Sequence, residues 1–402
     1  MVTEHIDERA DDREKERLQD LVAKHQNGED LHPVLTPITA ADCVEYPPVR
    51  YILDDLIEAE SITLISGKEK IGKTYVLMHM ALCMAAELSW LDIPTMADDK
   101  GGVLWLDFDM NRNTTIRRIN QITNGIEEAW NVRKPDLFKK FGMMDAQLFR
   151  DAGYSNKVQF FRKDEEELSD AVLGLREYII ANNVKVCFID NLVQIEGNAQ
   201  ENSSNDIQKV FSEIKALRDL TKCAFILIHH TTKDGFRGRG SSDIFGETDL
   251  NLQLEPCENP DQLLLKTDGA RNSARQTIGM MKKWIPRIGE DGINALKDEN
   301  GHDIHNFTLS RIETDGLIQD AKKEKKDAQI RTNIEKIVTL FQKNGNVGLS
   351  KNGISNACNT DQRYSDECKL QGGRSVELES IDEAEKQGLI IKDGKFYKLP
   401  TS

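Results

Sequence analysis

The stretch Gly67-Lys68-Glu69-Lys70-Ile71-Gly72-Lys73-Thr74 decides the fold of this chain. It reads G-x-x-x-x-G-K-T, the pattern of a loop that holds phosphate groups. Residues 61–65 before it form a β-branched run typical of a buried strand, and residues 74–87 after it carry apolar side chains at helical spacing. A strand, a glycine loop and a helix N-terminus in this order direct backbone N–H groups at one anion. The sequence therefore predicts a P-loop, a site for nucleotide phosphates.

The residue types within this loop predict a nucleotide and Mg²⁺ as its ligands. Lys73 is expected to reach the β- and γ-phosphates, and the Thr74 hydroxyl to complete the Mg²⁺ shell. The nucleotide-binding set predicted from the loop is Gly67, Lys70, Ile71, Gly72, Lys73, Thr74 and Tyr75.

Composition limits the class of protein. The chain has 402 residues, of which 39% are hydrophobic and 30% charged, as in a globular protein with a large core and an accessory domain. No apolar run is long enough to cross a bilayer, and none of the seven cysteines forms a C-x-x-C pair. These features predict a cytoplasmic protein without a membrane partner. The net charge of −15 disfavours a broad nucleic-acid coat but allows a local basic channel.

The order of patterns predicts an α/β fold with a mostly parallel sheet. Strand-like and helix-like segments alternate after residue 48, and the strands are nearly continuous apolar runs, as in sheets covered on both faces. Later short runs without helices between them predict an antiparallel extension. The expected strands are 102–109, 158–161, 184–190 and 224–230, then 250–254, 263–267, 278–284 and 307–312; the expected helices are 114–124, 168–182 and 207–221.

Four regions are expected along the chain. Residues 1–47 form a charged N-terminal arm, 48–314 the ATPase core, 315–329 a charged linker, and 330–402 a winged-helix-like domain. The last assignment follows from helical patterns and a terminal hairpin with a D-G turn. Its helix 375–387 is acidic, which is unfavourable for phosphate contact. We therefore expect this domain to bind a replication initiator or another protein, or to pack within the chain, rather than to bind duplex DNA.

Two strand ends supply the acids that such a site requires. Residues 186–190 are an apolar run that ends in Asp190, which we expect to hold the Mg²⁺ shell. The alternative is an ordinary turn-forming aspartate. The strand 102–109 ends with Asp107 and Asp109 on one face, and Asp109 is the preferred group to orient or activate water, with Asp107 in reserve.

A polar strand end and a glycine-rich loop follow. The strand 224–230 ends in two histidines. Adjacent strand residues face opposite ways, so we do not expect the two side chains to bind one metal ion together. We expect His230 to sense the γ-phosphate instead. The loop after it contains Lys233, Arg237 and Arg239 among glycines and one aromatic residue. This composition indicates either contact with a DNA backbone or a solvated flexible loop.

The order of these motifs resembles the RepA-type hexameric replicative helicases, which are RecA-like P-loop ATPases. The resemblance covers roughly residues 49–280 and is carried by VRYILDDLI, ITLISGKEKIGKT, WLDIP, GGVLWLDFDMN, RRIN, VCFIDNL, FILIHHTTK, GRGSSDIFGETD and LLLKTDGARN. It implies a ring that hydrolyses ATP between subunits and moves single-stranded DNA through its centre. It also implies that the catalytic acid lies on the strand next to the P-loop strand.

The resemblance assigns further roles. Lys266 and Arg271 lie where related rings place a pair that reaches the neighbour's γ-phosphate, with Arg275 as a rival because the spacing is wide. Asp109 stands where the family has Glu, one methylene longer. The leading hypothesis is therefore a replicative helicase of a plasmid, phage or other mobile element. The alternatives are an ATP-gated DNA-binding regulator, recombination mediator or helicase loader with weak hydrolysis and, less favoured, a small-molecule kinase.

Overall fold

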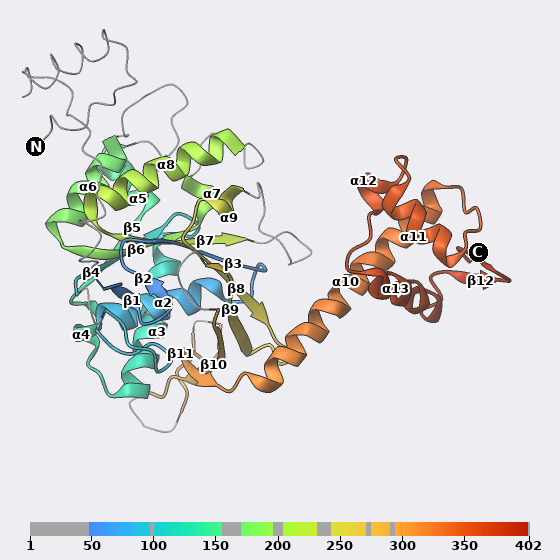
Figure 1. The fold of residues 1–402 in the computed structure, drawn as a ribbon. Helices are drawn as coiled ribbons and strands as arrows, with labels where there is room; N and C mark the ends of the chain where they lie inside the picture. The colour runs from blue at the N-terminus through green and yellow to red at the C-terminus, as the bar shows by residue number, and fades with distance from the viewer. Residues whose placement is uncertain are drawn as a thin grey trace, which may run out of the picture. The chain divides into compact units, whose positions relative to one another are not determined.

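The computed structural model describes residues 48–96, 100–154, 170–195, 204–230, 243–270, 275–289, 294–298 and 300–400. Within these residues the centre of the core is a nine-stranded sheet of order β11-β10-β9-β8-β3-β7-β6-β4-β5 (Figure 1). The strands are β3 (Ile62–Gly67), β4 (Gly102–Asp107), β5 (Phe141–Asp145), β6 (Val184–Asp190), β7 (Ala224–His230), β8 (Leu250–Pro256), β9 (Gln262–Ala270), β10 (Thr277–Pro286) and β11 (His305–Ile312).

The sheet has a parallel and an antiparallel part. Every neighbouring pair from β8 to β5 is parallel, and every pair from β8 to β11 is antiparallel. The predicted α/β class is confirmed, and the strands 184–190 and 224–230 have the predicted bounds. The prediction was wrong for β8, which pairs in parallel with the P-loop strand β3. The strand β5 was not predicted from the sequence, and the predicted strand 158–161 lies outside the described residues.

The position of β4 corrects another expectation. The acid-bearing strand β4 is not next to β3, because β7 and β6 lie between them. The acids still reach the P-loop side, since parallel strands place their carboxyl ends at one edge of the sheet.

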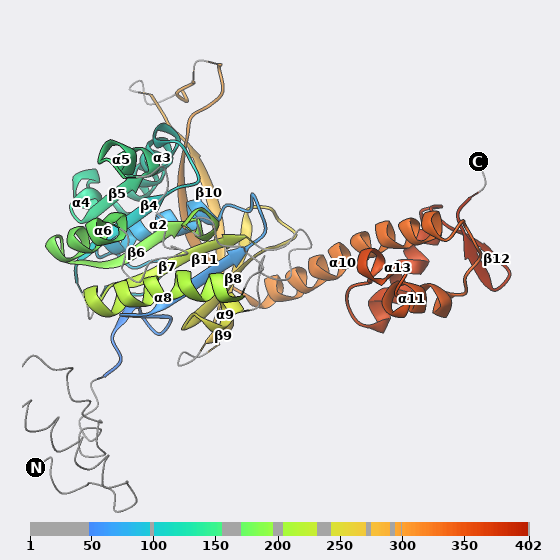
Figure 2. The ribbon, with the colours of Figure 1, turned by 90° about the horizontal axis from the view of Figure 1, so that it is seen from above.

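Helices cover both faces of the sheet. The helices α2 (Lys73–Ala85) and α3 (Arg112–Trp130) bury apolar residues with one face, and α6 (Asp170–Ala181) and α8 (Ser204–Thr221) with the other (Figures 1 and 2). The α2 helix is buried nearly all round, because α3 and β11 also pack against it. Shorter elements complete the core: β1 (Tyr51–Leu53), β2 (Ile57–Glu58), α4 (Lys134–Phe138), α5 (Ala146–Asp151), α7 (Leu192–Ile195) and α9 (Asp243–Gly246).

The C-terminal region has its own apolar core. The end of α10 (Asp315–Lys343) packs with α11 (Lys351–Thr360) and α13 (Arg374–Lys386) around buried residues such as Phe341, Ile354 and Ile381. The short α12 (Ser365–Cys368) and the antiparallel hairpin β12 (Ile391–Asp393) and β13 (Phe396–Lys398) complete it. Helices followed by a hairpin are compatible with the winged-helix-like expectation.

The expected linker 315–329 differs from an irregular connection, because it forms the first half of α10. Its Leu, Lys, Glu, Gln and Ala residues are strong helix formers, and the charge run contains no proline. Leu317 packs with Cys257 and Leu264, which fixes the beginning of the helix. The boundaries of the four regions stay predictions. In the described part of the chain, no helix combines the length and the apolar character of a membrane span.

Candidate active site

The P-loop is a backbone cradle whose shape requires two glycines. Gly72 has a φ angle of 101° directly before α2, in the left-handed region that favours glycine. At Gly67, a Cβ atom would lie 2.8 Å from the carbonyl oxygen of Leu254 on β8. With both turns in place, the first N–H groups of α2 face the loop without intrahelical acceptors. This arrangement is the anion site that the motif predicts.

Lys73 lies inside this cradle. Its side chain folds back across the loop, and its ammonium donates to the carbonyl oxygens of Gly67 at 2.7 Å and Lys68 at 2.9 Å. Only 5% of the residue is exposed, and burial lowers the pKa of Lys73 to about 8. A desolvated cation held by neutral carbonyls is stabilised by a bound anion. Lys73 therefore suits the phosphate-binding role.

Thr74 and Asp190 meet at the carboxyl edge of the sheet. The Thr74 hydroxyl donates to Oδ2 of Asp190 at 2.8 Å, although the two residues are far apart in the chain. Asp190 is 2% exposed, and burial, together with the charges of Asp107 and Asp109, raises its pKa to about 7. Hydroxyl and carboxylate oxygens are the ligands that Mg²⁺ prefers, and clustered buried carboxylates favour a cation. The residues present therefore fit a magnesium ion.

Asp107 and Asp109 have different surroundings. Asp107 is buried and accepts hydrogen bonds from the Thr115 hydroxyl at 2.6 Å and from the N–H groups of Asp109 at 3.2 Å and Met110 at 3.0 Å. Burial raises the pKa of Asp107. Asp109 is exposed just beyond the strand end. Asp107 thus holds the turn into α3, and Asp109 is the acid that a water molecule can reach.

Asn191 is a site residue to which the sequence analysis gave no role. Its side-chain N–H₂ donates to Oδ1 of Asp109 at 3.1 Å, so it positions the exposed acid. Asn191 is 3% exposed, and its own side-chain oxygen is buried without a hydrogen bond among the described residues. Such an atom is costly unless a donor such as water or ligand reaches it. The sequence feature that could have identified Asn191 as a site residue is its position directly after Asp190.

The remaining predicted residues are only partly placed. In the register of β7 against the P-loop strand, His230 is opposite Gly67, and the preceding His229 is buried opposite Ser66. Lys266 on β9 forms an ion pair with Glu255 on β8, so a carboxylate of the same chain already compensates its charge. Arg271 and the DNA-binding candidates Lys233, Arg237 and Arg239 lie outside the described residues.

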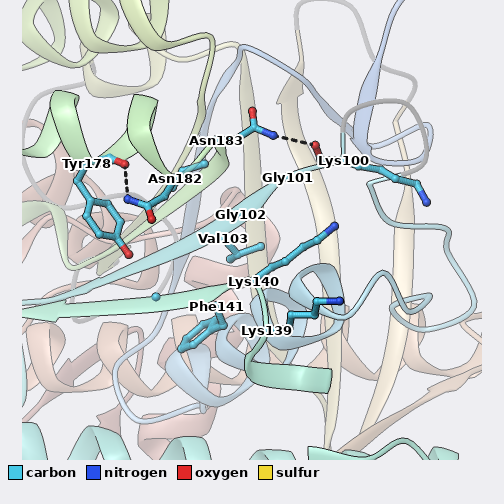
Figure 3. A pocket seen from close by; sticks show the side chains of 12 residues that line it. Lys100, Gly101, Gly102, Val103, Lys139, Lys140, Phe141, Tyr178, Asn182 and Asn183 are labelled. Atoms are coloured by element: carbon cyan, nitrogen blue, oxygen red, sulfur yellow. Dashed lines mark hydrogen bonds between the residues drawn. The ribbon is translucent and has the colours of Figure 1, made fainter. Parts of the chain in front are cut away.

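A separate cavity lies at the amino edge of the sheet. Its volume is about 260 Å³, and Lys100, Lys139 and Lys140 line it together with the beginnings of β4, β5 and β6 (Figure 3). Glu87 bonds both Lys100 at 2.6 Å and Lys140 at 2.5 Å. Two of the three lysines at this edge are thus paired with a carboxylate of the same chain.

A strand, a glycine cradle with a buried lysine, and a hydroxyl bonded to a buried acid together define a P-loop nucleotide site. Comparison with known families agrees: residues 29–235 match the AAA domain family AAA_25. Since the match covers just over half of the chain, the protein belongs to this family of P-loop ATPases. No curated protein matches the chain.

Proposed function

We propose that this ATPase is an ATP-dependent DNA motor, a ring-forming replicative helicase of a plasmid, phage or other mobile element. The observation that carries the proposal is the exposed acid Asp109 beside the Thr74–Asp190 pair, at the sheet edge that holds the P-loop. An NTP site that only binds needs no acid open to water, whereas hydrolysis does. The order of motifs, from the P-loop to the His-His strand and the glycine–arginine loop, supports a ring motor.

Within one chain, different residues would bind the phosphates, hold the metal ion and activate the water molecule. Lys73 and the N–H groups of the P-loop bind the phosphates and stabilise the charge that develops on them. Thr74 and Asp190 would hold Mg²⁺, which supplies further positive charge at the phosphate oxygens. Asp109 orients the attacking water and accepts its proton, and Asn191 fixes the carboxylate by the 3.1 Å hydrogen bond.

A second subunit completes the proposed site. Lys266 and Arg271 would act on the γ-phosphate bound by a neighbouring chain, and the ion pair of Lys266 with Glu255 must open for this. A hexameric ring with Lys233, Arg237 and Arg239 on single-stranded DNA would couple hydrolysis to movement.

The test is the ATPase rate of the purified chain with and without oligo-dT, together with its native mass in the presence of an ATP analogue. We expect DNA-stimulated hydrolysis by a multi-subunit ring, and loss of hydrolysis in Lys73→Ala. Absence of both stimulation and ring would refute the motor. Tight binding of ATP and DNA with negligible strand displacement would instead support the ATP-gated regulator, which the short Asp109 side chain favours.

A further inference from the structure

A second lysine, Lys282, lies against the P-loop although its strand is not a neighbour of the P-loop strand in the sheet. Lys282 belongs to β10, which is separated from the P-loop strand β3 by β9 and β8. Nevertheless its side-chain Cδ lies 3.7 Å from the position that a Cβ of Gly72 would occupy. Strand β10 therefore passes close to the N-terminus of α2, where the phosphate groups bind.

The charge of Lys282 is poorly compensated by the protein. The residue is half-buried, and burial lowers its pKa, with Asp261 opposing this effect. Its ammonium makes no hydrogen bond or ion pair among the described residues. The next residue, Lys283, is exposed and points to the opposite face of the strand. An unpaired, partly desolvated cation beside an anion-binding loop is stabilised when an anion binds.

The same face of β10 presents an aromatic ring two residues further on. Trp284 is 42% exposed, and its ring lies 5.1 Å from that of Tyr75, which is in the first turn of α2. The Arg118 guanidinium lies over the Tyr75 ring at 5.2 Å. Trp284 is thus held in place on one side and open on the other.

Beyond Trp284 the surface is hollowed. A cavity of about 760 Å³ lies between α3 and the end of the β10–β11 hairpin, a size suited to a small-molecule ligand. Its lining includes Trp284, Arg117 and five side-chain amides, which can donate and accept hydrogen bonds: Asn120, Gln121, Asn124, Asn300 and Asn306. An aromatic face beside such amides is suited to a nucleobase.

We propose that β10 forms the outer half of the nucleotide site in the same chain, with Lys282 binding a phosphate oxygen and Trp284 contacting the nucleobase. The two side chains are about 7 Å apart along one strand face. They therefore follow the extended nucleotide from the P-loop to the cavity. The inference rests on the proposed function in one respect, that a nucleotide occupies the P-loop.

The first test compares the affinity of the full-length protein for ADP and for inorganic pyrophosphate. Lys282→Ala should weaken both by tenfold or more, and Lys282→Arg should restore part of the loss. Lys283→Ala removes an equal charge from the other face and should stay within twofold of wild type. Equal affinities in Lys282→Ala and wild type would overturn the role of Lys282.

The second test uses tryptophan fluorescence. The chain has four tryptophans, and Trp130, 37% exposed, is the matched control for Trp284. ADP should change the emission of wild type and Trp130→Phe but not of Trp284→Phe, and pyrophosphate should leave the Trp284 signal largely unchanged. An ADP response retained in Trp284→Phe would overturn the role of Trp284.

Lys73→Ala separates the two levels of inference. If it abolishes binding of both probes while the Lys282 and Trp284 variants behave as wild type, the P-loop site stands and the outer half is wrong. If Lys73→Ala binds both probes normally, the nucleotide site itself is wrongly assigned.

Discussion

The two edges of the parallel sheet carry charge in opposite ways. At the carboxyl edge, the buried groups Lys73, Asp107 and Asp190 bond to neutral carbonyls, hydroxyls and amides, and burial shifts their pKa values towards the neutral forms. At the amino edge, Glu87 lies between Lys100 and Lys140, and their hydrogen bonds lower its pKa to about 2.

This difference distinguishes charged groups that are suited to bind a ligand from charged groups that form ion pairs within the chain. At the amino edge, two of the three lysines that line the cavity share a carboxylate partner without any bound molecule. The carboxyl edge holds desolvated charges that would be better compensated by phosphate and a metal ion than by the groups now around them. Lysines around a cavity are therefore weaker evidence for a site than a buried lysine and carboxylate bonded to neutral groups.

Among the substitutions that test the difference between the two edges, Asp109→Asn is expected to have the largest effect, on the ATPase rate. Removal of the base should lower the ATPase rate by roughly 10²–10⁴-fold, since general-base catalysis contributes about that much. Because Asp109 is exposed, the unfolding temperature and the affinity for ADP should stay close to wild type. Steady-state ATPase, calorimetric ADP binding and thermal unfolding measure the three quantities.

Asp107→Asn is the matched control for this substitution. Unlike Asp190, Asp107 holds three donors, so the loss of hydrogen bonds should outweigh the gain from removing a desolvated charge and lower the free energy of unfolding by about 1–3 kcal/mol. If Asp107→Asn left stability unchanged and abolished turnover while Asp109→Asn did not, the roles of the two acids would be reversed.

Asp190→Asn should stabilise the protein in EDTA at pH 8. The folded-state pKa of Asp190 is about 7, above the ordinary value of 3.8. Between these values the unfolded chain releases a proton that the folded chain keeps, so stability falls as pH rises and the loss is complete above pH 7. Removing the charge should add roughly 1–3 kcal/mol to the free energy of unfolding at pH 8.

Denaturant unfolding of both proteins at pH 8 and pH 4 tests this. At pH 4 both side chains are mostly neutral in the folded state, and the difference should nearly vanish. A variant less stable than wild type at pH 8 would show that the carboxylate is already well compensated by the protein.

The smallest effect is expected at the amino edge, from Glu87→Gln. The lowered pKa of Glu87 means that its contribution is present above pH 4.5 and is lost as pH falls towards 2. Because the pairs are largely exposed, the substitution should lower the free energy of unfolding by less than about 1 kcal/mol at pH 7. Nucleotide affinity should not change, and a loss of ADP binding would contradict the separation of the two edges.

The sequence predicted most of what local pattern controls. The P-loop, the strands 184–190 and 224–230 and the acid at Asp190 all followed from motif and apolar period. The parallel pairing of β8 was missed because a short apolar run does not reveal the direction of its neighbour. The helix at 315–329 was not predicted, because a run of charged residues is typical of both a linker and an exposed helix.

The site was predicted less fully, since several of its contacts join distant segments. Asn191 and Asp109 are brought together only when β6 and β4 pair, so the spacing of the two residues in the sequence does not predict their contact. Lys282 reaches Gly72 through the arrangement of the antiparallel strands. The different uses of Asp107 and Asp109 depend on burial, which alternation along a strand cannot resolve for residues on one face.

The most direct test of the central claim is the thermal unfolding midpoint of the full chain with Mg²⁺ and ADP. At about one hundred times the dissociation constant the ligand should add about 2.7 kcal/mol to the free energy of unfolding. For a chain of this length, this corresponds to a rise of roughly 3–5 °C in wild type. Lys73→Ala should show almost no rise under the same conditions. No rise in wild type, or an equal rise in both proteins, would contradict the assignment of the carboxyl edge as the nucleotide site.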